Sequence, residues 1–552
     1  MQAKNMQANT RHKEKKANNF FVQGSILAVA SIISRLIGLI YRVPLNNIIG
    51  DEGMGIYSFA FNIYNLGLII SSYSLPLAVS KLVAARNVKK EYKNGYRIFL
   101  CALSFAVAMG LVVSMILFFG ADFIATTFYN SPRVAIPLRV LAPTIFVFSI
   151  MGVLRGFYQG KNTMIPTSIS QLLEQIVNAI VSIVAANWLI HAHSANEDMA
   201  AYGAAGATFG TLMGTIVSLL FLAFVFALYK PVIDKQLRRD RDENRETVKE
   251  LFTALAVTSI PVIIGQTVYQ LNSVIDGSLF GHFMTEKGLT LDEKNALWGV
   301  YSNKYNLLVN VPVSIASAMA VAIIPNIVSS FASKKIYEVK EKVSQAVKFN
   351  MIIAIPSAVG MGVLASPILQ LLFKDTSVLP ANLLRIGSIA IIFYALSTIT
   401  NAVLQGINRM RLPVRHSAIS LVVHIILVFL LLKFTDLKVY VMVIGNVTFA
   451  LLVCVLNWIS IGKHLNYKQE VKTSFIMPTI CSVIMGVFTF LTYKGVHIVT
   501  HSNTISTMLS IIVSCIVYGV LLLVTKCLTE EELYELPMGT RFLRIAKKLK
   551  LL

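Results

Sequence analysis

Residues 159–166 read QGKNTMIP, and residues 405–413 read QGINRMRLP. Both passages run from Gln-Gly through Asn and Met to a Pro that opens the next apolar stretch, with one residue inserted in the second copy. Proline suits the first turn of a helix, where its missing N–H has no intrahelical partner to lose. A second echo, YNL at residues 64–66 and again at 305–307, has a similar displacement along the chain. The chain therefore carries an internal repeat.

The apolar stretches around these echoes are long enough to cross a bilayer, whose core of about 30 Å requires roughly 20 residues of helix. The sequence predicts fourteen spans, at 20–43, 56–80, 97–120, 134–154, 165–190, 203–229, 252–281, 298–325, 349–373, 382–404, 413–433, 438–462, 474–493 and 505–526. Both echoes are displaced by six spans, an even number, so the two copies have the same orientation across the membrane. That relation predicts two lobes related by an axis along the membrane normal.

The predicted fold is an all-α polytopic membrane protein with two pseudo-symmetric six-helix lobes and two additional C-terminal helices. The expected divisions are a basic tail (1–19), a first lobe (20–230), a basic linker (231–249), a second lobe (250–463), the extra helices (464–527) and a second basic tail (528–552).

The net charge of +22 is spread over alternate gaps between the spans. The second gap, for example, carries Arg86, Lys89, Lys90 and Lys93, whereas the odd gaps are acidic or mixed. Cationic loops stay in the cytoplasm, so both termini are expected there, and an even number of spans agrees with this. Charge dispersed in this way indicates topology and attraction to anionic lipids, and it argues against a nucleic-acid partner.

The three tryptophans, Trp188, Trp298 and Trp458, fall near predicted span ends, as interfacial anchors do. The sequence contains no Walker A, HExxH or GxSxG motif and no Cys/His spacing typical of a metal site. These observations predict a transporter without a cofactor, not an enzyme. Its energy would come from an ion gradient, the membrane potential or the flow of substrate.

The first span contains two arginines, and a charge at mid-bilayer marks a functional candidate because it costs several kcal/mol. Arg35, Gly38 and Arg42 are spaced i, i+3 and i+7, which places them on one helical face. Arg35 lies about 22 Å along the helix, too deep to reach the cytoplasm easily, whereas Arg42 is nearer the outer surface. Forked guanidinium donors suit phosphate, so the pair indicates an anionic cargo.

Other polar residues inside spans extend the candidate site. Lys304 in the eighth span is either a counterpart of the arginines or a cation that snorkels outward. Asp276 in the seventh span is a candidate for ion coupling or for a salt bridge. The fifth span carries a polar stripe that lines a cavity or holds helices together. Its members are Gln171, Glu174, Gln175 and Asn178.

Residues 155–175, RGFYQGKNTMIPTSISQLLEQ, resemble the signature of SpoVB-like polysaccharide-export proteins. The first span, with Ser34, Arg35, Gly38 and Arg42, resembles the opening of MurJ-type lipid II flippases. Both groups belong to the multidrug/oligosaccharidyl-lipid/polysaccharide (MOP) exporter superfamily. The resemblance covers essentially the whole chain.

The resemblance implies a MATE-like fold around a cationic cavity, with the last two helices forming a groove for a polyprenyl tail. It implies alternating access in a bacterial cell membrane, with a lipid-linked anionic glycan and membrane lipids as partners and a monomeric protein. The implied cargo is lipid II, an undecaprenyl-pyrophosphate-linked peptidoglycan precursor. Another polyprenyl-linked glycan, a drug or cation antiporter and a membrane glycosyltransferase are the alternatives, and two deep arginines argue against a cationic drug.

Some members of the family bind sodium through an Asp in the seventh span, a pair in the eleventh and a Thr in the twelfth. Asp276 and Thr448 match that pattern, but the eleventh span has His424 and Val428 at the pair's positions. Sodium binding is therefore doubtful.

Overall fold

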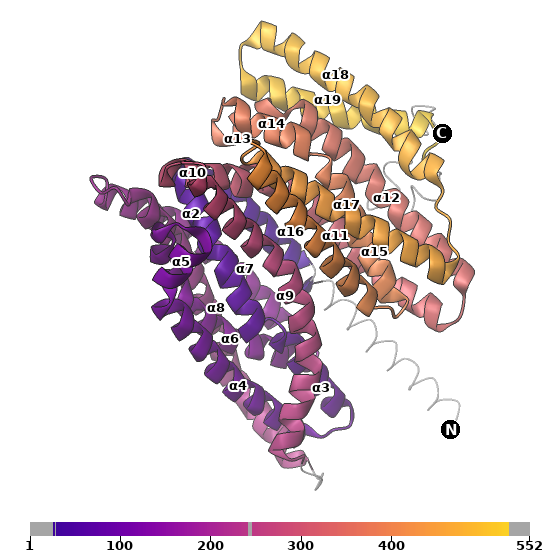
Figure 1. Cartoon of the computed structure of the whole chain (residues 1–552). Coiled ribbons are helices and arrows are strands. Elements are labelled where there is room, and N and C mark those ends of the chain that lie inside the picture. The colour runs from indigo at the N-terminus through magenta and orange to yellow at the C-terminus, as the bar shows by residue number, and fades with distance from the viewer. Residues whose placement is uncertain (1–25, 28, 241–245, 529–552) are drawn as a thin grey trace. The chain divides into compact units, whose positions relative to one another are not determined.

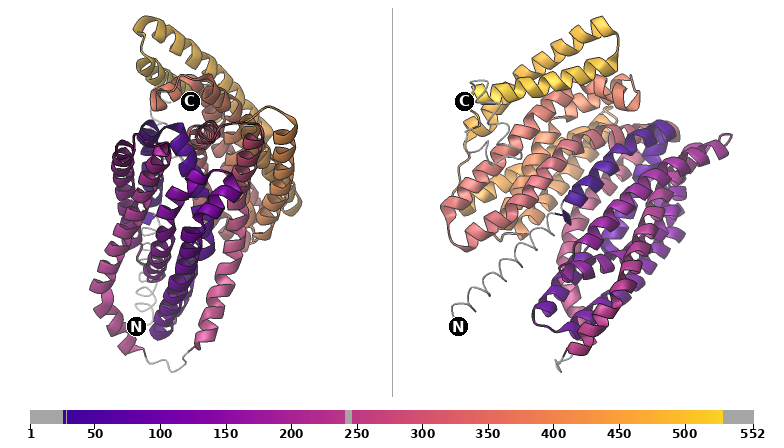
Figure 2. Two further views of the ribbon diagram at one scale, coloured as in Figure 1. Left: turned by 60° about the vertical axis from the view of Figure 1, so that its left-hand side comes forward. Right: turned by 180° about the vertical axis from the view of Figure 1, so that it is seen from behind.

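The computed structural model describes residues 26–27, 29–240 and 246–528, and this part of the chain contains helices and turns but no strand. It divides into two compact units, Met1–Gly299 and Val300–Leu552. The expected all-α class is confirmed. The helices of both units are drawn in Figure 1 and from two further directions in Figure 2.

The first unit begins with the helix Val29–Ile40. Its other helices are α2 (Arg42–Ser71), α3 (Leu75–Val88), α4 (Tyr92–Phe119), α5 (Ala121–Tyr129), the short 3₁₀ turn η1 (Pro132–Val134), α6 (Ala135–Gly160), α7 (Ile165–Ala192), α8 (Met199–Arg239), α9 (Val248–Glu286) and α10 (Leu291–Gly299). A buried apolar cluster from α3, α4, α6, α8 and α9 forms a core, in which the rings of Phe99, Phe157 and Phe226 pack together.

The second unit begins with the π-helix η2 (Val300–Tyr305). It continues with α11 (Asn306–Ala332), α12 (Ile336–Val363), α13 (Ala365–Phe373), α14 (Val378–Gly387), α15 (Ala390–Gly406), α16 (Arg411–Phe434), α17 (Tyr440–Leu465), the π-helical turn η3 (Lys472–Ile476), α18 (Met477–Thr500) and α19 (Asn503–Val524). The last two helices lie side by side, and Tyr518 and Leu522 of α19 share a buried cluster with Ile352 of α12 (Figures 1 and 2).

Eleven helices in the described residues are long and apolar enough to span a membrane, or twelve if the bent pair α14 and α15 forms one span. The expected span at 298–325 is not among them; the chain there runs through the end of α10, η2 and most of α11. The span expected at 20–43 lies partly outside the described residues, and its described part contains the shorter helix Val29–Ile40. The count of fourteen is therefore not confirmed.

The first helix continues beyond the predicted end of its span. Tyr41 N–H donates to the Ile37 carbonyl and Leu45 N–H donates to the Tyr41 carbonyl, each at 3.1 Å, so helical hydrogen bonding runs into α2. The break comes at Gly50, with φ +70° and ψ 178°, a conformation that favours glycine. Asp51 and Glu52, which the charge pattern placed in an outer gap, are instead helical. The gap is short because one glycine is enough to reverse the backbone.

Local structure supports the internal repeat. Six residues with left-handed backbone fall at matching places in the two halves, as the pairs Lys90 and Lys334, Asn130 and Lys374, and Asn162 and Asn408. In the repeated motif, α6 ends at Gly160 and α15 ends at Gly406, and the asparagine that follows has φ 58° or 60°. Asparagine tolerates this region better than most residues, which explains its place in both copies.

Glycines hold α8 tightly against α7. A Cβ atom added to Gly206, Gly210 or Gly214 would lie 2.6 Å, 2.1 Å or 2.5 Å from atoms of α7. Small residues spaced by four allow helix backbones to approach closely in membranes. This Gly-x-x-x-Gly pattern holds α8 close against α7, the helix that carries the predicted polar stripe.

The expected basic linker is largely helical. The helix α8 extends to Arg239, and α9 begins at Val248, so most of 231–249 prolongs two long helices; residues 241–245 lie outside the described part. Thr247 caps α9 by accepting from Glu250 N–H, while the Glu250 carboxylate accepts from Thr247 N–H at 2.7 Å. This reciprocal capping box explains why α9 starts there.

Two tryptophans differ from each other in burial. Trp188 is 67% exposed, which suits the predicted interfacial anchor. Trp298 is only 2% exposed and stacks on Phe59, with ring centroids 4.8 Å apart. The expectation of an interfacial anchor was therefore wrong for Trp298, which belongs to the interior of the first unit.

Candidate functional site

The polar stripe of α7 lies along the first helix. Ser31 Oγ donates to Gln171 Oε1 at 3.1 Å, and Asn178 Nδ2 donates to Tyr41 OH at 3.4 Å. Between these contacts, a Cβ on Gly38 would be 3.4 Å from Gln175 Oε1. This is an ordinary contact distance, so the amide of Gln175 lies beside the helix that carries Arg35.

Arg35 is placed on the same face of that helix, four residues after Ser31 and three before Gly38. Its side chain is exposed. The contact of Ser31 with Gln171 shows that this face of the helix lies along α7, and the helical spacing places Arg35 on it. Contact with a substrate stays a prediction.

Arg42 is half-buried under aromatic rings of α2. Its guanidinium carbon lies 5.9 Å from the ring centroid of Tyr57 and 5.8 Å from that of Phe61. These are cation–π distances, which stabilise a cation that has lost part of its water. The rings come from the part of α2 beyond Gly50, so the reversal of the chain there positions them. The rings of Tyr57 and Phe61 hold the Arg42 guanidinium, so the side chain does not need to extend to the membrane surface.

Glu174 forms a buried ion pair with Arg155. Arg155 Nη2 of α6 lies 2.7 Å from Glu174 Oε2, and both side chains are largely buried. Arg155 also donates to Ser170 Oγ at 2.9 Å and to Ser218 Oγ at 3.1 Å. The pair therefore joins α6, α7 and α8.

The contacts of Gln171, Glu174 and Asn178 favour the helix-packing interpretation of the stripe. Ligand contacts by Gln171, Glu174 or Gln175 stay a prediction. Sequence reasoning did not identify Arg155 as a partner, although opposite charges on either side of one interhelical turn were a signal for it.

Asp276 of α9 is 3% exposed. The same stretch of α9 is joined to α2, where Asn62 Nδ2 donates to the Ser273 carbonyl at 3.5 Å and Gln270 Nε2 donates to the Asn62 carbonyl at 3.3 Å. Asn272 precedes Asp276 by one helical turn, and its buried Oδ1 has no hydrogen-bond partner within the described residues. No group of three or more His, Cys, Asp or Glu side chains suited to a metal occurs in the same part of the chain.

Lys304 lies in the second unit and is 3% exposed. Its Nζ forms an ion pair with Asp375 and lies 6.0 Å from the centroid of the Phe373 ring. Burial raises the pKa of Asp375, but hydrogen bonds from Lys304 and Ser377 outweigh it and leave the pKa below its usual value. The structure therefore shows Lys304 paired with a carboxylate, neither open to a ligand nor reaching outward.

The span-11 residue His424 is fully buried, and its Nδ1 lies 2.9 Å from the Gly445 carbonyl of α17. A Cβ on Gly445 would be 2.7 Å from the imidazole, so glycine makes room for this ring. Thr448 Oγ1 donates to the Ile444 carbonyl of its own helix at 2.7 Å. Weak or absent sodium binding stays a prediction.

Comparison with known proteins gives two family matches. The model of the polysaccharide biosynthesis protein family matches residues 22–331, and the MatE model matches residues 298–430. Stage V sporulation protein B of Bacillus subtilis (strain 168) is 26% identical over 96% of this chain and 99% of that protein. Lipid II flippase MurJ of the same organism is 27% identical over 84% of this chain and 86% of the relative.

Solved structures show the same fold. An inward closed conformation of lipid II flippase MurJ superposes with a TM-score of 0.65, at 17% identity, over 90% of this chain and 97% of that one. An inward-facing multidrug resistance MATE family transporter of the MOP superfamily superposes with a TM-score of 0.63, at 16% identity, over 81% of this chain and 99% of that one. The expectation of a MATE-like fold is thereby confirmed.

Proposed function

The chain belongs to the polysaccharide biosynthesis protein family of membrane transporters in the MOP superfamily, and on that premise we propose that it is a lipid II flippase. It carries undecaprenyl-pyrophosphate-linked peptidoglycan precursor from the inner to the outer leaflet by alternating access. We place it in the bacterial cell membrane as a monomer, with both termini in the cytoplasm. Its partners are the lipid-linked glycan and membrane lipids, and it requires no cofactor.

The observation that carries this proposal is the pair of Arg35, in the first helix, and Arg42, at the start of α2. Arg35 is exposed beside the polar stripe of α7, while Arg42 is held under the rings of Tyr57 and Phe61. Guanidinium groups donate in a fork that matches phosphate oxygens, and the weakly hydrated ion tolerates partial burial. A pyrophosphate carried on a lipid is an anion that such a pair can bind and release.

Two observations separate the candidate cargoes. The 27% identity to a lipid II flippase over most of both chains favours lipid II. The description of the matching family, polysaccharide biosynthesis, favours another polyprenyl-linked glycan as the second candidate. A cationic drug is disfavoured, because Glu174 is already neutralised by Arg155.

The test is depletion of the protein in its host, followed by measurement of lipid-linked precursors in each leaflet. Lipid II should accumulate in the inner leaflet and disappear from the outer one. Accumulation of a different polyprenyl-linked glycan, with normal flipping of lipid II, would identify the second candidate as the cargo.

We further propose that the membrane potential drives transport and that dependence on sodium is weak. Moving one charge through 100 mV is worth about 2.3 kcal/mol, enough to bias a two-state carrier. The buried Asp276 offers a carboxylate, but His424 and Thr448 are engaged with backbone carbonyls. Flipping in proteoliposomes should therefore be similar in sodium and in potassium buffers at equal potential. Strict sodium dependence that disappears in Asp276→Asn would refute this mechanism.

A further inference from the structure

A groove of about 550 Å³ opens on the surface of the first unit, and sites for small molecules commonly have volumes of about 300–1,000 Å³. One residue of α2 and five residues from the C-terminal part of α7 line it. The lining residues are Ile48, Ile183, Val184, Asn187, Trp188 and His191. All of them belong to the same compact unit.

Packing next to the groove holds α2 and α7 together. Ile49 follows the lining residue Ile48, and Ile190 precedes the lining residue His191. A Cβ on Gly203 of α8 would lie 2.9 Å from Ile190 Cδ1 and 3.1 Å from Ile49 Cγ2, so both side chains pack against this glycine. The helix α8 therefore supports both walls of the groove.

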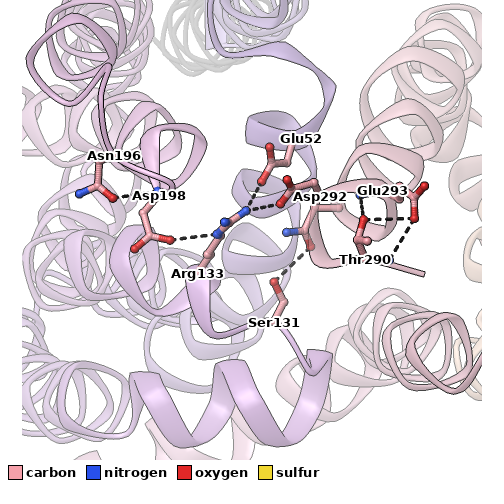
Figure 3. Close-up of polar contacts among 9 residues, drawn as sticks. Glu52, Ser131, Arg133, Asn196, Asp198, Thr290, Asp292 and Glu293 are labelled. Carbon is pink, nitrogen blue, oxygen red and sulfur yellow. Dashed lines mark hydrogen bonds and ion pairs between the residues drawn. The ribbon is translucent and has the colours of Figure 1, made fainter. Parts of the chain in front are cut away.

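An arginine joins the same segments of the first unit (Figure 3). Arg133 forms ion pairs with Glu52 of α2 at 2.7 Å and with Asp198, in the turn between α7 and α8, at 2.9 Å. It also pairs with Asp292 of α10, and Asp198 N–H donates to Asn196 Oδ1 at 3.0 Å. The Arg133 side chain is 15% exposed, so these pairs are less screened than pairs at an open surface. These contacts give the groove a defined shape without a ligand.

The lining changes in character along α7. Ile183 and Val184 are apolar, whereas Asn187, Trp188 and His191 lie further toward the C-terminal end of the helix and carry polar groups. Residues three and four apart share a helical face, so the apolar and polar parts form one continuous strip. Trp188 is 67% exposed, as is typical of the membrane–water interface. A ligand that matches this strip has an apolar chain and a polar head, as a membrane lipid has.

The polar end of the groove suits a cation. None of the six described lining residues is Lys or Arg. The C-terminal end of α7, at Ala192, carries the partial negative charge of the helix dipole. The exposed indole of Trp188 is the aromatic ring that attracts cations best. These features favour a headgroup that carries an ammonium over one that is only anionic.

His191 adds a hydrogen-bond acceptor to this end. Its Nδ1 lies 2.7 Å from the Asn187 carbonyl oxygen, which can only accept, so the proton of the neutral ring is on Nδ1. The lone pair is then on Nε2, and within the described residues Nε2 has no hydrogen-bond partner. The ring can therefore accept a hydrogen bond from a ligand. A primary ammonium has N–H groups to donate, and a quaternary ammonium has none.

We propose that this groove binds a phospholipid with a primary ammonium headgroup, of the phosphatidylethanolamine type. Its acyl chain lies on Ile48, Ile183 and Val184, and its ammonium lies between the Trp188 ring and His191 Nε2. The predicted topology places this end of α7 on the outer side, so the lipid comes from the outer leaflet. The proposal concerns a lipid that the protein holds, and it does not depend on which cargo the protein moves.

The test measures lipid binding to the purified full chain in detergent micelles by native mass spectrometry. Dioleoyl phosphatidylethanolamine, phosphatidylcholine and phosphatidylglycerol are added in separate titrations. The ethanolamine lipid should bind about tenfold more tightly than the choline lipid, because only its ammonium donates a hydrogen bond to His191. Phosphatidylglycerol should bind most weakly. Equal affinity for the three lipids would overturn the proposal.

Variants assign the binding to the groove. Val184→Trp, at a position that is 62% exposed, should fill the apolar part and abolish retention of the ethanolamine lipid. His191→Ala should remove the preference for ethanolamine over choline, whereas Trp188→Ala should weaken binding of both lipids by about fivefold. Phe123→Ala removes an exposed aromatic ring of α5 outside the groove and should bind as the wild type does. Unchanged binding by Val184→Trp would contradict the assignment.

Two other occupants would give different results, and either would overturn the proposal. Stronger retention of undecaprenyl phosphate than of the ethanolamine lipid would assign the groove to a polyprenyl chain. A dimer that Val184→Trp dissociates would assign it to a second copy of the chain. Because binding is measured without transport, failure of the lipid II proposal would leave these results unchanged and would show only in the precursor measurement.

Discussion

Arg35→Ala is expected to abolish complementation of a strain depleted of this protein, while the variant still inserts and accumulates normally. Arg35 is exposed on the face of the first helix that lies along α7, so its removal takes away donors and not packing. Hydrogen bonds to a charged group contribute about 1.5–3 kcal/mol each. Loss of a two-pronged contact with pyrophosphate therefore corresponds to at least about a hundredfold in transport.

Graded variants separate charge from geometry at this site. Arg35→Lys should rescue growth only in part, because an ammonium keeps the charge but loses the planar fork. Arg411→Ala removes another exposed arginine, at the start of α16, and should grow normally. Normal growth of Arg35→Ala at wild-type expression would show that the cargo is bound through its sugar or lipid tail instead.

Arg155→Met should destabilise the folded protein by about 3–5 kcal/mol, the usual effect of removing one partner of a buried ion pair. The side chains of Arg155 and Glu174 are 8% and 15% exposed, so Glu174 would keep a charge that solvent barely reaches. Ser170 and Ser218 would also lose their charged donor. Denaturant unfolding in detergent micelles measures the change.

The double variant Arg155→Met/Glu174→Leu tests the cause. Removing both charges should recover most of the lost stability, because a buried pair replaced by apolar side chains is often nearly neutral. Lys335→Met is the matched control, since it breaks an exposed i,i+3 pair with Glu338 and should change stability little. A single variant as stable as wild type would mean that water or another group neutralises Glu174.

The lengths of the apolar stretches in the sequence determined that this is an all-α membrane protein. A stretch that crosses a bilayer has no water to bond to, so its backbone groups must form hydrogen bonds within a helix. The Gln-Gly…Pro echo predicted a repeat, and the positive φ angles of Asn162 and Asn408 agree with it. The spacing of Arg35, Gly38 and Arg42 predicts a shared face, and that prediction stays untested. Each of these properties depends on residues close in sequence, so periodicity alone could reveal it.

Only the tertiary structure decided how the polar residues are used. Glu174 pairs with Arg155 on a neighbouring helix, Lys304 pairs with Asp375, which is 71 residues away, and Trp298 is buried against Phe59. A sequence shows that a charge inside a span needs compensation, because leaving it alone is costly. It does not show which helix becomes the neighbour that supplies the opposite charge, since that depends on how distant segments pack.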